Sequence, residues 1–320
     1  MFSVSPIAYR THDHGDFDEE WLPHAGCSEW WYATSVVTDE DGKLFSLQFT
    51  ITKRLISAQN VYAVILSLTD FETGQHYLHQ QMSMSLKPLI LSKTTAQWED
   101  LCGAIKGPHS MKLFAQAGEW SYDLTLDYGK GAFWHCQQGV LQMGLPDQDQ
   151  TTTYFSYTNM PTSGVIAIGD RVFRVRGKTW FDKQGGSYTD TRRETHWEWF
   201  SFRFDDDEEI MLFSFPQSDY ADGTYIPKTG SARRLNHYAI TPDKFVRVEG
   251  KLFSFGWTVR MPGIKDEIYS VKPKIEGQWN GGFFELLADV TAQDGRHVGV
   301  CYVELLPGVL NDTNSTASNG

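Results

Sequence analysis

The sequence lacks any concentration of basic charge. Its 28 Lys and Arg residues stand against 40 Asp and Glu residues, which gives a formal net charge of −12, and no basic run exceeds a pair such as Arg192-Arg193 or Arg233-Arg234. Proteins that bind nucleic acid or an anionic membrane surface present a clustered basic face. We therefore expect no nucleic-acid partner.

Long apolar runs and clustered cysteines are also missing. No stretch approaches the roughly 18 apolar residues of a membrane helix, and the N-terminus has no basic start followed by an apolar run. We expect a cytoplasmic protein that is not integral to a membrane. Cys27, Cys102, Cys136 and Cys301 are widely spaced, without C-x-x-C or a nearby His in ligand spacing. This pattern predicts reduced, structural thiols rather than a zinc site or a disulfide framework.

Several catalytic signatures are absent as well. The chain has no P-loop, no G-x-G-x-x-G after a predicted strand, no G-x-S-x-G and no H-E-x-x-H. The sequence therefore shows none of the usual motifs for phosphoryl transfer, nicotinamide redox chemistry, serine hydrolysis or zinc-dependent proteolysis. We expect neither a metal nor an organic cofactor.

What is present is a long series of predicted strands. Helical periodicity is scarce, and the best short window is 94–102. Runs of β-branched and aromatic residues recur between Gly, Asp and Asn turns, and 31–38 followed by an acidic turn and 44–52 is typical of a hairpin. So many strands with so little helix predict an all-β protein built from antiparallel barrels or sandwiches.

A weak internal similarity suggests two domains. Residues 28–49 contain Glu-Trp-Trp, an acidic turn and a second apolar strand, and residues 197–215 repeat this order. This similarity predicts that the same hairpin opens each half of the chain, although two similar hairpins also arise by chance. We predict an N-terminal β domain over 1–190, a C-terminal β domain over 191–308 and a mobile tail over 309–320.

Glu29 is the first candidate for chemistry. Strand alternation puts Glu29 and Trp31 on one face, and Trp30 and Tyr32 on the other. A carboxyl group buried beside indole rings has a raised pKa, which suits a general acid near neutral pH. The alternative is that Glu29 pairs with an Arg and the aromatic residues are ordinary core.

Asp182 is the second candidate. Trp180, Asp182 and Gln184 share one face if this segment is extended, and Gly185-Gly186 predicts a turn that lets a ligand approach. Asp182 is then a proton donor or polar anchor, with a turn-capping Asp as the alternative.

Tyr157 on the predicted strand 153–157 is the third candidate. Its phenol could orient a substrate oxygen, and the alternative is a core tyrosine that hydrogen-bonds to the backbone.

Several of these segments together resemble a known family. His24-x-x-x-Ser28-Glu29-Trp30-Trp31-Tyr32, Tyr154-Phe155-Ser156, Gly177-x-x-Trp180-Phe181-Asp182-x-Gln184-Gly185, Trp197-x-Trp199-Phe200 and 299–305 are similar to the AttH/CrtC lipocalin-like family. That family includes carotenoid 1,2-hydratase, kievitone hydratase and decalin-forming Diels–Alderases. The resemblance implies two consecutive lipocalin-like antiparallel β-barrel domains with a ligand pocket in or between them.

The resemblance also implies a function and a site. It points to a cofactor-independent lyase or isomerase that hydrates, dehydrates or cyclises a hydrophobic, unsaturated small molecule, with Asp182 on the family's W-x-D motif as the proton donor. Lys183-Gln184-Gly185-Gly186 departs from the His or Arg and Trp-Gly that follow this Asp in the hydratases. The expected catalytic residues are Asp182, Glu29 and Tyr157, and the expected substrate-binding residues are Trp30, Trp31, Tyr32, Gln48, Phe155, Trp180, Gln184 and Trp199.

Two alternatives use the same pocket differently. A pericyclase would fold a polyene by shape without an essential acid. A lipocalin-like carrier would hold an apolar ligand and perform no chemistry. The sequence favours an enzyme over a carrier and leaves the substrate and the oligomeric state open.

Overall fold

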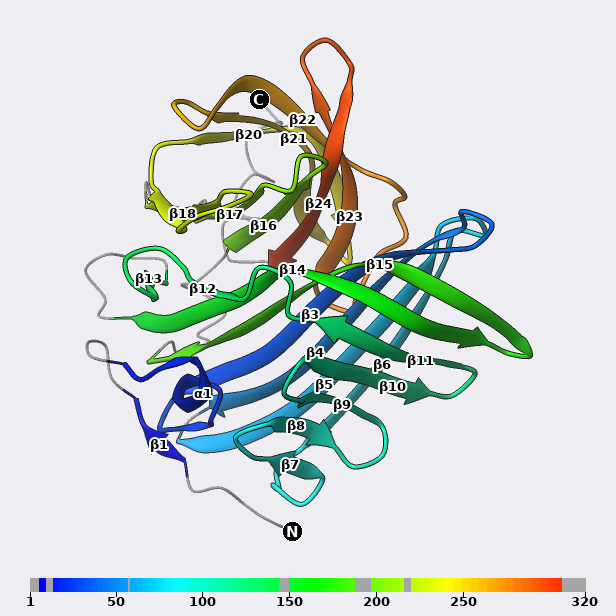
Figure 1. Cartoon of the computed structure of the whole chain (residues 1–320), viewed down its shortest axis with the longest axis vertical. Coiled ribbons are helices and arrows are strands. Elements are labelled where there is room, and N and C mark those ends of the chain that lie inside the picture. The colour runs from blue at the N-terminus through cyan, green and yellow to red at the C-terminus, as the bar shows by residue number, and fades with distance from the viewer. Residues whose placement is uncertain are drawn as a thin grey trace. The chain divides into compact units, whose positions relative to one another are not determined.

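The protein is almost entirely β-structure, as the computed structural model shows (Figure 1). The structure describes residues 6–9, 14–56, 58–143, 150–187, 197–215 and 220–306. The predicted domain boundary at residue 190 and the predicted tail at 309–320 lie outside the described residues. No helix in the described ranges is long and apolar enough to cross a membrane.

The described elements comprise one short helix and a long series of strands. In chain order they are β1 (Ile7–Ala8), α1 (Phe17–Glu20), β2 (His24–Ala25), β3 (Ser28–Asp39), β4 (Leu44–Ile56), β5 (Gln59–Asp70), β6 (Gln75–Ser83), β7 (Leu89–Leu91), β8 (Thr95–Trp98), β9 (Cys102–Lys106), β10 (Ser110–Ala117), β11 (Trp120–Asp127), β12 (Ala132–Trp134), β13 (Val140–Gln142), β14 (Thr151–Ile168), β15 (Arg171–Gly186), β16 (Trp197–Phe204), β17 (Glu209–Ser214), β18 (Ala221–Ile226), β19 (Arg233–Leu235), β20 (Ala239–Val248), β21 (Lys251–Met261), β22 (Lys265–Pro273), β23 (Phe284–Ala292) and β24 (His297–Leu306).

The described part of the chain divides into two compact units. The first unit ends at Trp134 and resumes at Thr151, and the intervening residues from His135 to Gln150 belong to the second unit. The remainder of the second unit follows β15. The prediction of two consecutive domains did not include this assignment of His135 to Gln150 to the second unit.

The first unit is built on a curled antiparallel sheet (Figure 1). Its strands follow the order β6-β5-β4-β3-β15-β14-β11-β10-β9-β8-β7. Strand β11 shows why these sequences become strands, because Trp120, Tyr122, Leu124 and Leu126 alternate with polar residues and all four join the buried core. One face of the sheet therefore carries an apolar, aromatic-rich core.

The second unit is a second antiparallel sheet, with the order β19-β18-β17-β16-β24-β23-β22-β21-β20. Its core contains Phe200, Phe202 and Phe204 from β16, with Trp257 from β21 and Phe284 from β23. Two curled antiparallel sheets with almost no helix confirm the predicted fold class. The hairpins β3–β4 and β16–β17 are also both formed, as their sequences predict.

The best predicted helical window needs correction. The window 94–102 is not helical: Thr95–Trp98 forms β8, in which Ala96 and Trp98 are buried and alternate with more exposed neighbours. Its pairing with β7 and β9 outweighs the weak helical period. The helix lies instead at Phe17–Glu20, where the Asp16 side chain accepts hydrogen bonds from the amides of Asp18 and Glu19.

The four cysteines are free and buried, which confirms the prediction of structural thiols.

The turn predicted at Gly185 and Gly186 is wrong, because β15 continues through both of them. A Cβ on Gly185 would lie 2.3 Å from Cβ of Glu29. Glycine is therefore needed here for close approach of β15 to β3.

Candidate functional site

All predicted site residues except Trp199 lie on four neighbouring strands of the first unit, β4, β3, β15 and β14. In this register Asp182 pairs with Tyr32 of β3 and Ser156 of β14, while Lys183 pairs with Trp31 and Phe155. Because successive side chains point to opposite faces, these strands carry two distinct constellations. We call them the Asp182 face, with Trp30, Tyr32, Gln48, Tyr154, Ser156, Trp180, Asp182 and Gln184, and the core face, with Glu29, Trp31, Lys53, Phe155, Tyr157, Phe181 and Lys183.

This division separates residues that the sequence analysis had grouped. Trp31, Phe155 and Tyr157 belong to the apolar core of the first unit, whereas Trp180 and Asp182 lie on the other side of the same strands. The grouping of Phe155 and Trp31 with Trp180 around one pocket was therefore wrong. Trp199 is buried on β16 of the second unit.

Asp182 is the centre of a buried hydrogen-bond network. Its side chain is 3% exposed. Trp180 Nε1 donates to Asp182 Oδ1 at 2.6 Å and Tyr154 hydroxyl donates to Oδ2 at 3.1 Å, and the Ser156 hydroxyl also donates to Oδ1. The predicted alternation of Trp180, Asp182 and Gln184 along one face is confirmed by this register, and Asp182 is not a turn cap, because it lies inside β15.

Polar groups continue across the Asp182 face. Gln184 Nε2 donates to Thr152 Oγ1 at 2.8 Å, and Gln48 on β4 donates to Thr50. Among the described residues, the buried atoms Gln48 Oε1 and Thr52 Oγ1 have no hydrogen-bond partner. Buried polar atoms without a protein partner are commonly satisfied by ordered water or a ligand.

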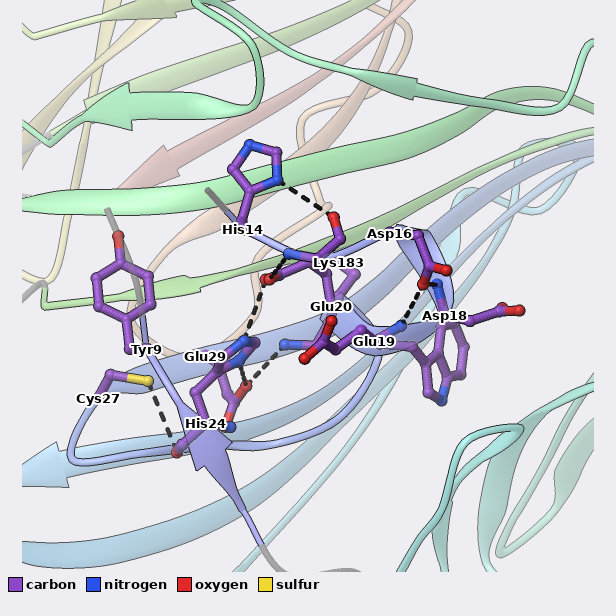
Figure 2. Close-up of polar contacts among 12 residues, drawn as sticks. Tyr9, His14, Asp16, Asp18, Glu19, Glu20, His24, Cys27, Glu29 and Lys183 are labelled. Atoms are coloured by element: carbon purple, nitrogen blue, oxygen red, sulfur yellow. Dashed lines mark hydrogen bonds and ion pairs between the residues drawn. The ribbon is translucent and has the colours of Figure 1, made fainter. Parts of the chain in front are cut away.

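The core face carries a charged cluster around Glu29 at its edge (Figure 2). Glu29 is fully buried; Lys183 Nζ donates to its Oε2 at 2.7 Å, and Lys53 pairs with Oε1. The backbone amide of His24 donates to Oε1 at 2.9 Å. The His24 ring bridges two carboxylates, with Nδ1 3.1 Å from Glu29 and Nε2 3.1 Å from Glu20 on α1.

The charge state of Glu29 differs from the prediction. Burial acts to raise the pKa of Glu29, but the Lys183 charge, the His24 hydrogen bond and the Lys53 charge outweigh it and hold this pKa well below its usual range. The raised pKa predicted from the indole surroundings was wrong. Glu29 is a carboxylate that pairs with two buried ammonium groups, and it has no proton to donate near neutral pH. The alternative interpretation, in which Glu29 pairs with an Arg, differs from the structure only in the cations, which are Lys53 and Lys183.

The cluster brings three potential metal ligands together. His24, Cys27 and Glu29 each offer a ligand atom, and these atoms lie within 4.8 Å of one another. Their chemistry does not fit a metal, because both carboxylate oxygens of Glu29 already face ammonium groups. Burial also raises the pKa of Cys27 to about 12, so its sulfur stays a thiol. The cluster is better suited to fixing α1 against β3.

Sequence reasoning missed Lys53, Lys183 and Ser156 as members of these constellations. Ser156 was part of a noted motif, but only the register reveals that it faces Asp182. The two lysines did leave a signal. Each occupies a position that alternation assigns to the interior of an apolar strand, and a buried lysine requires an anionic partner.

Tyr157 lies on the core face and lines a pocket of about 960 Å³ in the first unit. The wall opposite is formed by residues around α1 and by the turn between β9 and β10, including Asp18, Leu22 and Gly107. Asp182 is not among the lining residues. Tyr157 and Asp182 therefore belong to two separate places in the same unit.

Comparisons with known proteins agree with this architecture. A protein assigned to AttH from Nitrosomonas europaea superposes with a TM-score of 0.82 at 18% identity, covering 95% of this chain and 99% of that one. Kievitone hydratase from Nectria haematococca gives a TM-score of 0.75 at 15% identity, covering 92% of each chain. CghA with Sch210972 gives 0.50 at 9% identity, covering 88% of each chain. No curated protein sequence matches.

Identities this low establish a shared fold and nothing finer. The family assignment comes from a different comparison, because the AttH-like family model matches residues 10–308, which is most of the sequence. That match spans both units and confirms the resemblance inferred from the sequence. The chain belongs to the AttH-like family.

Proposed function

We propose that this protein is a cofactor-independent lyase or isomerase that acts on a hydrophobic, unsaturated small molecule, with Asp182 as its acid–base group. The observation that carries the proposal is the buried Asp182 carboxyl group held by Trp180, Tyr154 and Ser156 on one face of the sheet. Of the relatives that share the fold, one is by name a hydratase, of kievitone. Buried acidic groups on which several hydrogen-bond donors converge are frequent at catalytic sites.

The three hydrogen-bond donors around Asp182 can perform different tasks. Trp180 can only donate, so its indole N–H fixes the orientation of Oδ1. The hydroxyl groups of Tyr154 and Ser156 can both donate and accept, so they can carry a proton to or from Asp182. The site therefore has one orienting contact and two contacts through which a proton can move.

Hydration and dehydration use this arrangement in opposite directions. In hydration, protonated Asp182 gives its proton to an alkene carbon, water attacks the carbocation, and the proton that the water loses returns to Asp182. In dehydration, protonated Asp182 protonates the departing hydroxyl group, and the carboxylate takes a proton from carbon. Aromatic π faces such as that of Trp180 stabilise the intermediate cation. Each direction balances without a metal or an organic cofactor.

A defined product analysis tests this proposal. Small molecules that co-purify with the protein from its own host are extracted, identified, and incubated with it in heavy-oxygen water. Hydration incorporates heavy oxygen into the product, dehydration removes a water mass, and cyclisation leaves the mass unchanged while altering retention. Kievitone itself serves as the first test substrate.

The matched variants are Asp182→Asn and Asp123→Asn. Asp123 lies exposed on β11 and pairs with Lys112, so its replacement is expected to leave turnover unchanged. Asp182→Asn keeps the shape but removes the titratable proton, and we expect turnover to fall at least about 100-fold, the usual contribution of a general acid or base. Unchanged turnover in Asp182→Asn would exclude the acid–base role.

A further inference from the structure

The pocket beside α1 has the dimensions of a small-molecule site. Its volume is about 960 Å³, within the range of roughly 300–1,000 Å³ typical of ligand pockets. Every lining residue belongs to the first unit, including Leu22 next to α1, Thr94 between β7 and β8, and Tyr128 and Tyr157. The pocket is therefore complete within one unit.

Two tyrosines meet in this pocket and differ in their hydrogen bonding. Tyr128 donates its hydroxyl to the carbonyl oxygen of Gly107 at 2.7 Å. Its ring centroid lies 5.3 Å from that of Tyr157. Tyr157 is only 9% exposed, yet no described residue hydrogen-bonds to its hydroxyl. The Tyr157 hydroxyl is not among the buried polar atoms that lack a partner, so it reaches accessible space and offers an unused donor at the pocket wall.

Burial also keeps this donor protonated. It raises the pKa of Tyr157 to about 12, with smaller contributions from Tyr128 and the Asp18 charge. At any physiological pH the group is a neutral phenol that donates one hydrogen bond. A ligand that satisfies it needs an acceptor oxygen.

Behind Tyr157 the wall is aromatic. Phe155 contacts Tyr157 edge to face, with centroids 6.3 Å apart, and Phe17 of α1 packs on Phe155 at 5.2 Å. Trp134 stacks on Phe17 at 4.5 Å. Of these rings only that of Tyr157 lines the pocket, together with that of Tyr128, and the others hold Tyr157 in place from behind. The two neighbouring phenol rings favour a ring-containing apolar body over a flexible polar one.

The charged lining residues do not select an ion. Asp18 pairs with Lys106, whose ammonium group also lies 5.0 Å from the Trp21 ring centroid. Asp16, Glu19 and Lys93 complete the charged lining, so both signs are present and the remaining net charge is small. A strongly charged ligand would gain little here, which leaves a neutral molecule as the best match.

We propose that this pocket is a second ligand site, which binds a neutral, ring-containing apolar molecule through a hydrogen bond from the Tyr157 hydroxyl to a ketone-type oxygen. It is separate from the Asp182 face, because Tyr157 pairs with Phe181 and projects to the opposite side of β14 and β15 from Ser156 and Asp182.

A matched pair of probes tests the hydrogen bond directly. 2-Acetylnaphthalene has a ketone oxygen, and 2-ethylnaphthalene has nearly the same shape without one. We measure the Kd of each by equilibrium dialysis with the full chain, Tyr157→Phe, Tyr77→Phe and Thr94→Trp. Tyr77 is a half-buried tyrosine on β6 that is not among the pocket residues, so Tyr77→Phe controls for loss of a phenol elsewhere.

The expected results follow from the geometry. The full chain and Tyr77→Phe bind the ketone about fivefold more tightly than the hydrocarbon, which is the size of one neutral hydrogen bond. Tyr157→Phe binds both probes equally, with the affinity of the hydrocarbon unchanged. Thr94→Trp, which fills the pocket from its lining, binds neither.

Three results would overturn the proposal: no binding of either probe to the full chain, a ketone preference that survives in Tyr157→Phe, or undiminished binding to Thr94→Trp. Circular dichroism confirms that each variant is folded before its Kd is interpreted. Because the readout is probe binding and not turnover, the result is independent of the role proposed for Asp182.

Discussion

Glu29 in the first unit and Glu198 in the second occupy the same place in their sheets. Each is the second residue of the strand that starts the long hairpin, β3 or β16, and each is followed two residues later by a core aromatic, Trp31 or Phe200. Each strand also pairs on its other side with a late strand of its unit, β15 or β24. The sequence similarity between the two hairpins is thus matched in three dimensions.

The surroundings of the two carboxyl groups are opposite. Glu29 faces two lysines and a histidine and has a lowered pKa. Burial raises the pKa of Glu198, and hydrogen bonds from Ser254 and Trp257 only partly offset it. Trp257 Nε1 donates to Glu198 Oε2 at 3.1 Å, and no ion pair to Glu198 is present among the described residues.

The register explains the difference. Lys53 pairs directly with Glu29, and Ser214 takes that position opposite Glu198. Lys183 pairs with Trp31, and Val303 takes that position opposite Phe200. The same backbone position therefore holds a carboxyl group with a lowered pKa in one unit and a raised pKa in the other, depending on two side chains contributed by neighbouring strands.

The largest expected effect comes from removing the negative charge of Glu29. Glu29→Gln leaves Lys53 and Lys183 buried without their anion, and we expect the free energy of unfolding to fall by about 3–5 kcal/mol at pH 7. Urea unfolding followed by tryptophan fluorescence measures it, with Glu198→Gln as the control in the other unit. A loss below about 1 kcal/mol would mean that the two lysines find other partners.

An intermediate effect is expected from His24. Burial acts to lower the pKa of His24, but the hydrogen bonds that its ring donates to Glu20 and Glu29 outweigh burial and raise it. The stability that charged His24 contributes is fully present below its unfolded pKa of about 6.5 and is lost as the pH rises through the folded value. Melting temperatures between pH 6 and pH 9 should therefore fall more steeply in the wild type than in His24→Gln. Parallel curves would rule out this titration.

The smallest effect is expected from Glu198→Gln. Because the folded pKa of Glu198 is raised, its ionisation costs stability as the pH rises from the unfolded value, about 4.3, through the folded one. A neutral Gln avoids that cost. The difference in the free energy of unfolding between the variant and the wild type should therefore be more favourable to the variant at pH 8 than at pH 4. The size of this change should be a fraction of the loss expected for Glu29→Gln. Urea midpoints at the two pH values measure this, and a destabilised variant at pH 8 would contradict it.

Alternation along single strands was predictable from the sequence. It placed Asp182 with Trp180, and Glu29 with Trp31, as the structure confirms. The all-β class followed from the same kind of local evidence, since strand and turn signals are short-range. The short helix α1 also had a local signal, because Asp16 is an N-cap followed by three acidic residues.

Register between distant strands was not predictable in this way. Lys183 reaches Glu29 across 154 positions in sequence, so the sequence around Glu29 gives no sign of its ammonium partners. Its indole neighbours alone suggested a raised pKa, the opposite of what the lysines produce. The separation of Phe155 from Trp180 likewise depends on which residues of β14 and β15 pair, a property of the assembled sheet.

The most direct test of Asp182 as the acid–base group is kcat for Asp182→Asn compared with Trp180→Phe on the same identified substrate. In the proposed mechanism Asp182 supplies the proton, whereas Trp180 orients the carboxyl group through one hydrogen bond and offers a ring face that phenylalanine partly retains. We predict that Asp182→Asn loses at least about 100-fold in kcat and that Trp180→Phe loses clearly less. The reverse order, with Asp182→Asn near wild type, would contradict acid–base catalysis and indicate a pocket that acts by shape.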